Sequence, residues 1–459
     1  MTGAASRARP SSGASFRRSI RPSHAVALYV SSVLGSGILV LPGLTARLAG
    51  PASLLAWALL AGASVPLALT FSGLSARRPE AGGIYGFVRE AFGVRAAAVT
   101  GWLIVLWSFT GGPAVTLIAA SYLGYAFPLS RPETFLLAFA VIGAAFSVNY
   151  RGITLSSRVQ LGVVGAIVAL LALVVLVAGR EVRLGNFTPF APEGLLPVGT
   201  AAAFIFWSFL GYENVSSVAA EFVDPARDFR RSVLWSVALV AVLYLSVAFV
   251  TVGTGAYRTG GSVAPFAAIL GGVFGPYASE GTALFALFIV FAVVNAYTAG
   301  MSRVVYAAAL DGALPGGLGW LDPDRRVPTR AMGFLLAGMS LVLVVYYFAG
   351  TDLSTALLTA GGAALITYAL GSAAGLRLLP PTAGGGRLPW LLAGFSLAFS
   401  LVLIPFVGWP IAVSLVGATV AYLYASRRGA TRRRAPGTPP RPQRPLSTGP
   451  PPEVAVTQR

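Results

Sequence analysis

Hydrophobic residues form long stretches along this chain, and polar residues gather in the short segments between them. A helix that crosses a bilayer needs roughly 20 mostly apolar residues. The pattern therefore predicts twelve membrane-spanning helices over residues 25–48, 51–74, 96–126, 132–149, 157–179, 198–220, 231–254, 281–309, 331–349, 353–376, 388–406 and 409–426. Because the intervening segments are short, no separate soluble domain is expected.

Two of these stretches carry flexible or charged residues near their centres. The first contains Val33-Leu34-Gly35-Ser36-Gly37-Ile38, and the second contains Phe209-Leu210-Gly211-Tyr212-Glu213 about half a chain later. Irregular backbone persists at bilayer depth only where it lines a cavity or is buried in protein, because lipid offers amide groups no partner. Paired interruptions in two halves of a chain point to the binding site of a transporter. We therefore predict that both helices are unwound at these places.

Composition places most of the chain in a membrane. Of its 459 residues 56% are hydrophobic and 10% are charged, and the mean hydropathy is +0.76. These values predict one integral membrane domain over residues 25–426 between two tails, residues 1–24 and 427–459. The tails are rich in Arg, Ser, Pro and Thr, so they cannot bury a core and are expected to be disordered.

Basic residues indicate which side of the membrane each segment faces. All 33 are Arg, and with the N-terminus inside, 28 of them fall on the cytoplasmic side. This excess follows the positive-inside rule, and an even number of spans returns both termini to the cytoplasmic face of the cell membrane. The net charge of +18 is thereby explained. No nucleic-acid partner is expected, because the charge is divided among short loops.

Segments between the spans add three expectations. Ile84, Phe87, Val88 and Ala91 recur at helical spacing, which predicts a short helix lying in the cytoplasmic interface. The outer loop 256–280 is long enough to form a lid. Arginines directly after the last span are expected to touch anionic lipid headgroups, with a partner-binding tail as the alternative.

The chain offers little material for catalysis. It has no Cys and one His, His24, which is expected to be a solvated residue at the inner edge of the first span. Thiol chemistry, disulfides and Cys-based metal sites are excluded. No catalytic residue, metal site or cofactor is expected, and an enzyme is the least supported class of protein.

Five motifs, taken together, resemble the amino acid–polyamine–organocation (APC) superfamily of secondary transporters. They span roughly residues 25–330 and read Gly35-Ser36-Gly37-Ile38, Pro79-Glu80-Ala81-Gly82-Gly83-Ile84-Tyr85, Gly211-Tyr212-Glu213, Glu221-Phe222-Val223-Asp224-Pro225-Ala226-Arg227-Asp228 and Ser302-Arg303-Val304-Val305-Tyr306. Within the superfamily, residues 207–231 look most like the bacterial L-methionine/branched-chain amino acid exporters.

The resemblance implies an all-α integral membrane fold with a five-plus-five inverted repeat. The repeats would cover about 25–179 and 198–376, with helices 1 and 6 unwound and two additional C-terminal helices over about 388–426. Transport would proceed by alternating access about helices 1 and 6.

Unwinding at the first interruption would create a helix N-terminus near mid-membrane. Its amide groups and the positive end of its dipole would hold an anion, here a substrate carboxylate. Carbonyl groups at both interruptions would receive an α-ammonium. The predicted substrate-binding residues are Ser32, Val33, Gly35, Ser36, Gly37, Ile38, Trp207, Phe209, Leu210 and Gly211. Close packing of helices through small residues is the alternative for the glycines and Ser36.

Aromatic and acidic residues mark the second interruption. In APC relatives an aromatic residue at the position of Trp207 covers the substrate, so the resemblance implies that Trp207 is a gate; the alternative is an aromatic ring in ordinary packing. For Phe209 both roles remain open. Glu213 is the one carboxylate placed well inside a span, where a charge is expensive to bury. It is a candidate for proton coupling, or for a hydrogen bond that fastens the unwound segment.

The coupling ion stays open between H⁺ and Na⁺. Some proton-coupled relatives carry a lysine in span 5, which residues 159–179 lack. Thr298 and Ser302 offer oxygens for a sodium site. Asn295, Tyr297 and Tyr306 are polar enough to face a cavity, with hydrogen bonds between helices as the alternative.

The expected substrate is a neutral, hydrophobic amino acid. Apart from Glu213, the spans offer no buried acid to meet a cationic side chain and no buried Arg to meet an acidic one. Export, import and exchange remain open. A polyamine or cationic amino acid antiporter of the same fold is the first alternative function, and a transport-inactive sensor or channel is the second.

Overall fold

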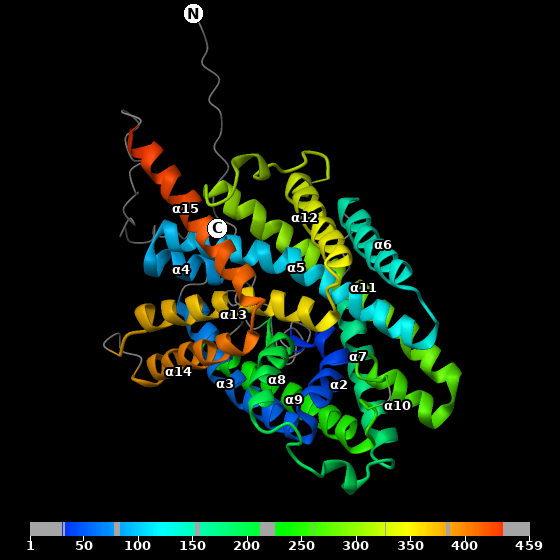
Figure 1. Cartoon of the computed structure of the whole chain (residues 1–459). Helices are drawn as coiled ribbons and strands as arrows, with labels where there is room; N and C mark the ends of the chain where they lie inside the picture. Colours follow the sequence, from blue (N-terminus) through cyan, green and yellow to red (C-terminus); the bar gives the residue numbers. More distant parts are fainter. Residues whose placement is uncertain are drawn as a thin grey trace, which may run out of the picture.

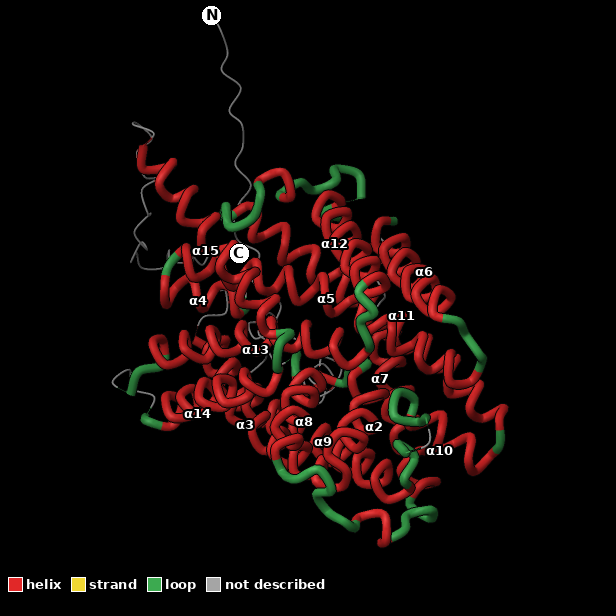
Figure 2. Tube along the Cα trace, viewed as in Figure 1, coloured by secondary structure: helices red, strands yellow, loops and turns green. Residues whose placement is uncertain are grey.

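The computed structural model describes residues 30, 33–77, 83–151, 157–211, 225–258, 260–325, 327–381 and 386–434. Within these ranges the chain forms helices joined by short loops and no strand (Figure 2), as the sequence predicts. The α-helices are α2 (Gly37–Ala49), α3 (Ser53–Arg77), α4 (Ile84–Phe92), α5 (Val94–Ala126), α6 (Arg131–Tyr150), α7 (Ser157–Ala178), α8 (Leu196–Phe206), α9 (Pro225–Thr254), α10 (Pro265–Phe274), α11 (Pro276–Leu310), α12 (Thr329–Phe348), α13 (Leu353–Leu378), α14 (Leu388–Leu403) and α15 (Ile411–Arg434).

Eight helical runs within the described ranges are long and apolar enough to cross a membrane. One of them, Gly37–Arg77, contains both α2 and α3, which are joined by a 3-10 turn over Gly50–Ala52. Shorter apolar helices lie at Gly162–Ala178, Leu196–Phe209, Pro265–Phe274 and Ile411–Ser426. Of the predicted spans 25–48 and 198–220, the described residues form α2 and α8, and both ranges also include residues outside the described part of the chain.

The helices pack in two groups with α13 between them (Figure 1). In the first group α2 and α3 pack against α8 and α9. In the second group α5, α6, α11 and α12 pack on one another. Helix α13 contacts α5 of the second group as well as α3 and α8 of the first, and it also packs against α14.

The outward faces of the helices are apolar. Leu136 of α6 is 69% exposed, Leu176 of α7 is 74% exposed and Phe348 at the end of α12 is 82% exposed. Exposed apolar surface of this kind is typical of proteins whose solvent is the hydrocarbon of a bilayer. The chain is therefore an integral membrane protein.

The short helix predicted after the second span is present as α4. It begins after Gly83 and ends before Gly93, whose φ angles of 73° and 84° favour glycine. Its apolar side packs against α5 and α13. On its polar side, Arg89 donates to the carboxylate of Asp311, at the end of α11, at 2.8 Å.

Two segments differ from the sequence-based boundaries. The outer loop 256–280 contains α10, which starts at Pro265 and contacts α2, α7 and α11. Proline is favoured at the first helical position because its missing N–H would have no acceptor there. Helix α15 continues to Arg434, whereas the tail was expected to begin at residue 427. Five of the eight residues in the extension are Arg, which is a good helix former, and adding residues to an existing helix avoids the cost of nucleation.

Candidate functional site

The first interruption lies just before α2. Leu34 and Gly35 have no regular structure, Ser36 forms a turn, and the helix begins at Gly37. The amide of Gly35 donates to the carbonyl of Val33 at 2.7 Å instead of following the helical pattern. The first amide groups of a helix have no acceptor within it. Because Ser36 and Gly37 are buried, the amide end of α2 lies inside the protein.

The second interruption follows α8. After Phe206 the helix tightens into a 3-10 turn over Trp207–Phe209. Leu210 is extended, with φ −79° and ψ 151°, and Gly211 has a φ of 124°, which favours glycine. The chain therefore leaves the helix at the position that the sequence predicts.

Two buried tyrosines hold the interruptions in place. The hydroxyl of Tyr244, on α9, donates to the carbonyls of Val33 at 3.1 Å and of Ser208 at 3.2 Å, and thus links both interruptions. The amide of Gly211 donates to the hydroxyl of Tyr368, on α13, at 3.1 Å. Side chains from the packed helices thereby satisfy backbone groups that the broken helices leave open.

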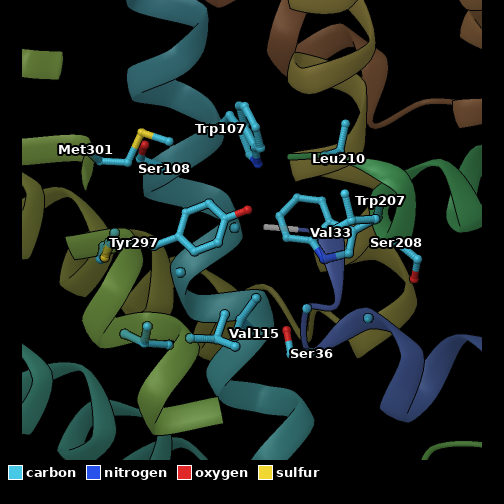
Figure 3. Close-up of a pocket in the computed structure, with 17 residues that line it drawn as sticks. Val33, Ser36, Trp107, Ser108, Val115, Trp207, Ser208, Leu210, Tyr297 and Met301 are labelled. Atoms are coloured by element: carbon cyan, nitrogen blue, oxygen red, sulfur yellow. The ribbon is translucent and has the colours of Figure 1, made fainter. Parts of the chain in front are cut away.

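A cavity lies between the two interruptions and encloses about 640 Å³ of space not filled by atoms, part of it open to solvent. Figure 3 shows its walls converging from both helix groups. The residues that line it are Val33, Gly35, Ser36, Gly37, Trp107, Ser108, Gly111, Gly112, Val115, Trp207, Ser208, Leu210, Val293, Val294, Tyr297, Met301 and Met339.

Trp207 spans the cavity between α2 and α5. A Cβ atom on Gly37 would lie 2.9 Å from the Cδ1 atom of Trp207, and one on Gly111 would lie 2.7 Å from its Cη2 atom. The indole therefore fits because both backbones lack a side chain. Its ring stands nearly perpendicular to that of Trp107, with centroids 6.3 Å apart. In Figure 3 the hydroxyl of Tyr297 points toward the Trp207 indole.

One part of the cavity wall is polar. The hydroxyl of Ser208 is buried and makes no hydrogen bond to any described residue. It lies close to the start of α2, since a Cβ atom on Gly37 would be 2.7 Å from its Oγ atom. A helix N-terminus with a hydroxyl beside it can hold an anion. Across the described ranges, no group of three His, Asp or Glu side chains could hold a metal ion.

A family model of amino acid permeases matches residues 20–426, which include every helix that lines the cavity. The chain belongs to the amino acid permease family. It is a transporter of the APC superfamily and not an enzyme, so the predicted superfamily is confirmed.

The permease is similar to proteins that match it along most of its length. It is 34% identical over 418 residues to the uncharacterized amino acid permease YecA of Bacillus subtilis (strain 168), which covers 91% of this chain and 98% of that one. It is 28% identical to the L-methionine/branched-chain amino acid exporter YjeH of Escherichia coli (strain K12), covering 88% and 95%. It is also 28% identical to the branched-chain amino acid permease BcaP of Bacillus subtilis (strain 168), covering 67% and 70%.

Six of the predicted substrate-binding residues of the permease line the cavity, namely Val33, Gly35, Ser36, Gly37, Trp207 and Leu210. Three others do not. Ile38 is fully buried in the packing of α2, and Phe209 packs between Trp57 and Tyr244, with ring centroids 6.4 and 5.3 Å away. The amide of Gly211 instead donates a hydrogen bond to the hydroxyl of Tyr368 on α13. Ser32 and Glu213 lie outside the described residues.

The sequence-based prediction omitted the contributions of α5 and α12. Helix α5 lines the cavity with Trp107, Ser108, Gly111, Gly112 and Val115, and α12 adds Met339. A signal for α5 was present, because the triplet Gly111-Gly112-Pro113 in the middle of a long helix removes side-chain volume and one backbone donor. No comparable sequence signal indicates that Met339 lines the cavity.

Residues of α11 divide between the cavity and the helix packing. Tyr297 lines the cavity. Asn295 accepts a hydrogen bond at 2.7 Å from the side-chain amide of Asn149, on α6, so it links two helices. The hydroxyls of Thr298 and Ser302 donate to carbonyls of their own helix at 2.8 and 3.0 Å.

Proposed function

We propose that this permease carries a neutral, hydrophobic amino acid across the cell membrane by alternating access. The observation that carries the proposal is the cavity between two interrupted helices, which has the N-terminus of α2 in its wall and apolar side chains over much of the remainder. An amino acid in water is a zwitterion, so its site must meet one negative and one positive group and then accommodate the side chain.

The start of α2 supports carboxylate binding. Backbone amides at Ser36 and Gly37, together with the positive end of the helix dipole, favour an anion there. Ser208 would contribute its hydroxyl, which has no partner among the described residues and would gain one when the ligand binds. Ser208 therefore joins the residues predicted from the sequence.

Carbonyl groups at the interruptions support ammonium binding. The carbonyl of Leu210 belongs to an extended residue that lines the cavity. The carbonyl of Trp207 accepts a backbone hydrogen bond from Leu210 at 3.4 Å, and because a carbonyl oxygen has two lone pairs it retains acceptor capacity for an ammonium. The carbonyl of Val33 already accepts from the Gly35 amide at 2.7 Å and from the Tyr244 hydroxyl at 3.1 Å, so an ammonium there would have to replace one of these donors.

The remaining wall favours a neutral side chain. Val115, Val293, Val294, Met301 and Met339 are apolar, and none of the lining residues in the described ranges is charged. A cationic amino acid or a polyamine would lose hydration here without meeting a counter-charge. Two relatives carry names that specify methionine or branched-chain amino acids, which agrees with a hydrophobic substrate.

The two helix groups support the proposed membrane arrangement of twelve spans within residues 25–426. Each group combines two predicted spans from residues 25–179 with two from residues 198–376, as an inverted repeat requires. The helices over 388–426 pack outside these groups, against α3, α5 and α13. We place both termini in the cytoplasm, on the basis of the arginine distribution.

Glu213 is the candidate for proton coupling, and hydrogen bonding within the second interruption is its alternative role. Glu213→Gln keeps the shape and removes the titratable proton. Uptake that loses its dependence on pH supports coupling to H⁺. If uptake in the variant depends on pH as it does in the wild type, Glu213 does not carry the proton, and imposed Na⁺ gradients test the other coupling ion.

The transport test uses the purified protein in proteoliposomes. Counterflow of labelled methionine and leucine should saturate, whereas arginine and putrescine should not compete. Transport of arginine without methionine or leucine would exclude a neutral substrate, and the absence of saturable counterflow would favour the channel or sensor alternative. Imposed gradients in each direction then distinguish export, import and exchange.

Ser208→Ala tests the carboxylate end, with Ser372→Ala as the matched control. Both hydroxyls are buried and have no partner among the described residues, but Ser372 lies on α13 and does not line the cavity. A hydrogen bond to a charged group contributes about 1.5–3 kcal/mol. We expect Ser208→Ala to weaken methionine binding by about 10- to 100-fold, and Ser372→Ala to leave it unchanged.

A further inference from the structure

Helices α5 and α12 interlock through two glycines. A Cβ atom on Gly112 of α5 would lie 2.7 Å from the Sδ atom of Met339 and 2.9 Å from its Cε atom. A Cβ atom on Gly338 of α12 would collide with the ring of Phe109 on α5. Each helix therefore presents a glycine at the point where its partner inserts a large side chain, and the two contacts use consecutive residues of α12.

The interlock admits a side chain from α12 into the cavity wall. Met339 is 3% exposed and lines the cavity together with Gly112. If residue 112 carried a side chain, that side chain would occupy the position of the Met339 thioether. The absence of a side chain on α5 thus exposes Met339, from the helix that packs on α5, to the cavity.

A second thioether in the cavity wall comes from α11. Met301 of α11 lines the cavity, as does Ser108 of α5. Methionine has three rotatable bonds and a polarizable sulfur, so it adapts to ligands of different shape. Only four of the 459 residues are methionine, and two of those four line this cavity.

We propose that Met339, seated on Gly112, closes a subsite for the substrate's side chain and sets the longest apolar side chain that the permease accepts. This inference rests on the proposed function, since the ammonium and carboxylate ends would be held at the two interruptions. The subsite accepts aliphatic and thioether side chains, and Met339 excludes larger aromatic rings.

Volume at this position therefore controls selectivity. In a hydrophobic pocket, one methylene changes the preference between two ligands by about 10- to 200-fold. Met339→Ala enlarges the subsite, so the affinity for phenylalanine relative to methionine should rise about tenfold or more. Gly112→Ala adds a methyl group where Met339 lies, so methionine and leucine should lose affinity relative to alanine by about tenfold.

The experiment measures ligand-induced thermal stabilisation of the purified full-length permease with alanine, valine, leucine, methionine and phenylalanine. Met332→Ala is the matched control, because Met332 lies on the same helix, is 2% exposed and does not line the cavity. The double variant Gly112→Ala/Met339→Ala replaces the lost thioether with the added methyl group. It should recover much of the affinity for leucine that Gly112→Ala loses.

The outcomes separate the inference from the function on which it rests. A change in the order of affinities in Met339→Ala that Met332→Ala does not share supports the inference. An unchanged order in Met339→Ala, or the same change in Met332→Ala, overturns it while ligand binding itself persists. If the wild-type protein is stabilised by none of these amino acids, the proposed function fails first and the subsite fails with it.

Discussion

Replacing Tyr244 with phenylalanine removes one oxygen atom from between the two interruptions and changes little else. The ring of Tyr244 packs against Trp57 and Phe209, with centroids 5.6 and 5.3 Å away, and phenylalanine keeps those contacts. What is lost is the hydroxyl that donates to the carbonyls of Val33 and Ser208. The variant therefore tests whether the geometry of the two interruptions depends on their shared donor.

The size of the effect follows from burial. Leaving buried carbonyl groups without their donor costs about 1–3 kcal/mol in proteins generally. Measured hydrogen bonds between membrane helices average about 0.6 kcal/mol and reach about 1.7 kcal/mol. We therefore expect Tyr244→Phe to lower the free energy of unfolding by about 1–2 kcal/mol. If the same energy holds the ligand-competent arrangement, methionine affinity should fall about 5- to 30-fold.

Tyr122→Phe provides the control for loss of a buried phenol. Tyr122 on α5 is also fully buried, and its hydroxyl donates to the carbonyl of Leu39, inside α2, at 2.5 Å. That bond fastens α2 without joining the two interruptions. The control should reduce thermal stability in detergent and leave the methionine titration within about twofold of the wild type, because no ligand contact depends on this bond.

Two results would contradict this reasoning. In the first, Tyr244→Phe loses stability but binds methionine as the wild type does. The hydroxyl would then stabilise the fold without affecting ligand binding. In the second, Tyr122→Phe loses as much affinity as Tyr244→Phe, which would make the effect a general loosening of α2. Titrations of all three proteins in one detergent distinguish these cases.

Two further predictions concern helix packing. Gly37→Ala should weaken methionine binding at least tenfold, because its Cβ would lie 2.7 Å from the Ser208 hydroxyl; Gly62→Ala, whose Cβ meets no atom within 4 Å, should bind normally in the same titration. Asn149→Ala should cost about 1–3 kcal/mol of unfolding free energy, since it removes the donor to the buried side-chain carbonyl of Asn295. Asn295→Ala should cost less, because the Asn149 amide keeps its bonds to the backbone carbonyls of Ala145 and residue 295. The double variant should cost less than the sum, and additive losses in this cycle would contradict the pairing.

Much of the fold could be predicted because it depends on local composition. Helices such as α6 and α13 occupy nearly the predicted residues, since lipid requires long apolar segments with internally satisfied backbone. Both interruptions were also readable, because Gly35 and Gly211 are local departures from that pattern.

The composition of the cavity wall was only partly predictable, because it depends on which helices meet. Phe209 and Trp207 are two residues apart and equally aromatic, yet one packs into the core and the other faces the cavity. That difference is set by the 3-10 turn and by Tyr244 on α9. The access of Met339 to the cavity likewise depends on the register between α12 and α5. Gly112 permits this access because it carries no side chain.

The position of Trp207 has a mechanical consequence. Its indole is a rigid strut whose two ends, Cδ1 and Cη2, abut the main chains of Gly37 and Gly111, which belong to different helix groups. While the side chain keeps this rotamer, the ring prevents α2 and α5 from coming closer together. A movement of one helix group against the other would therefore change the contact between the indole and at least one of the two glycines.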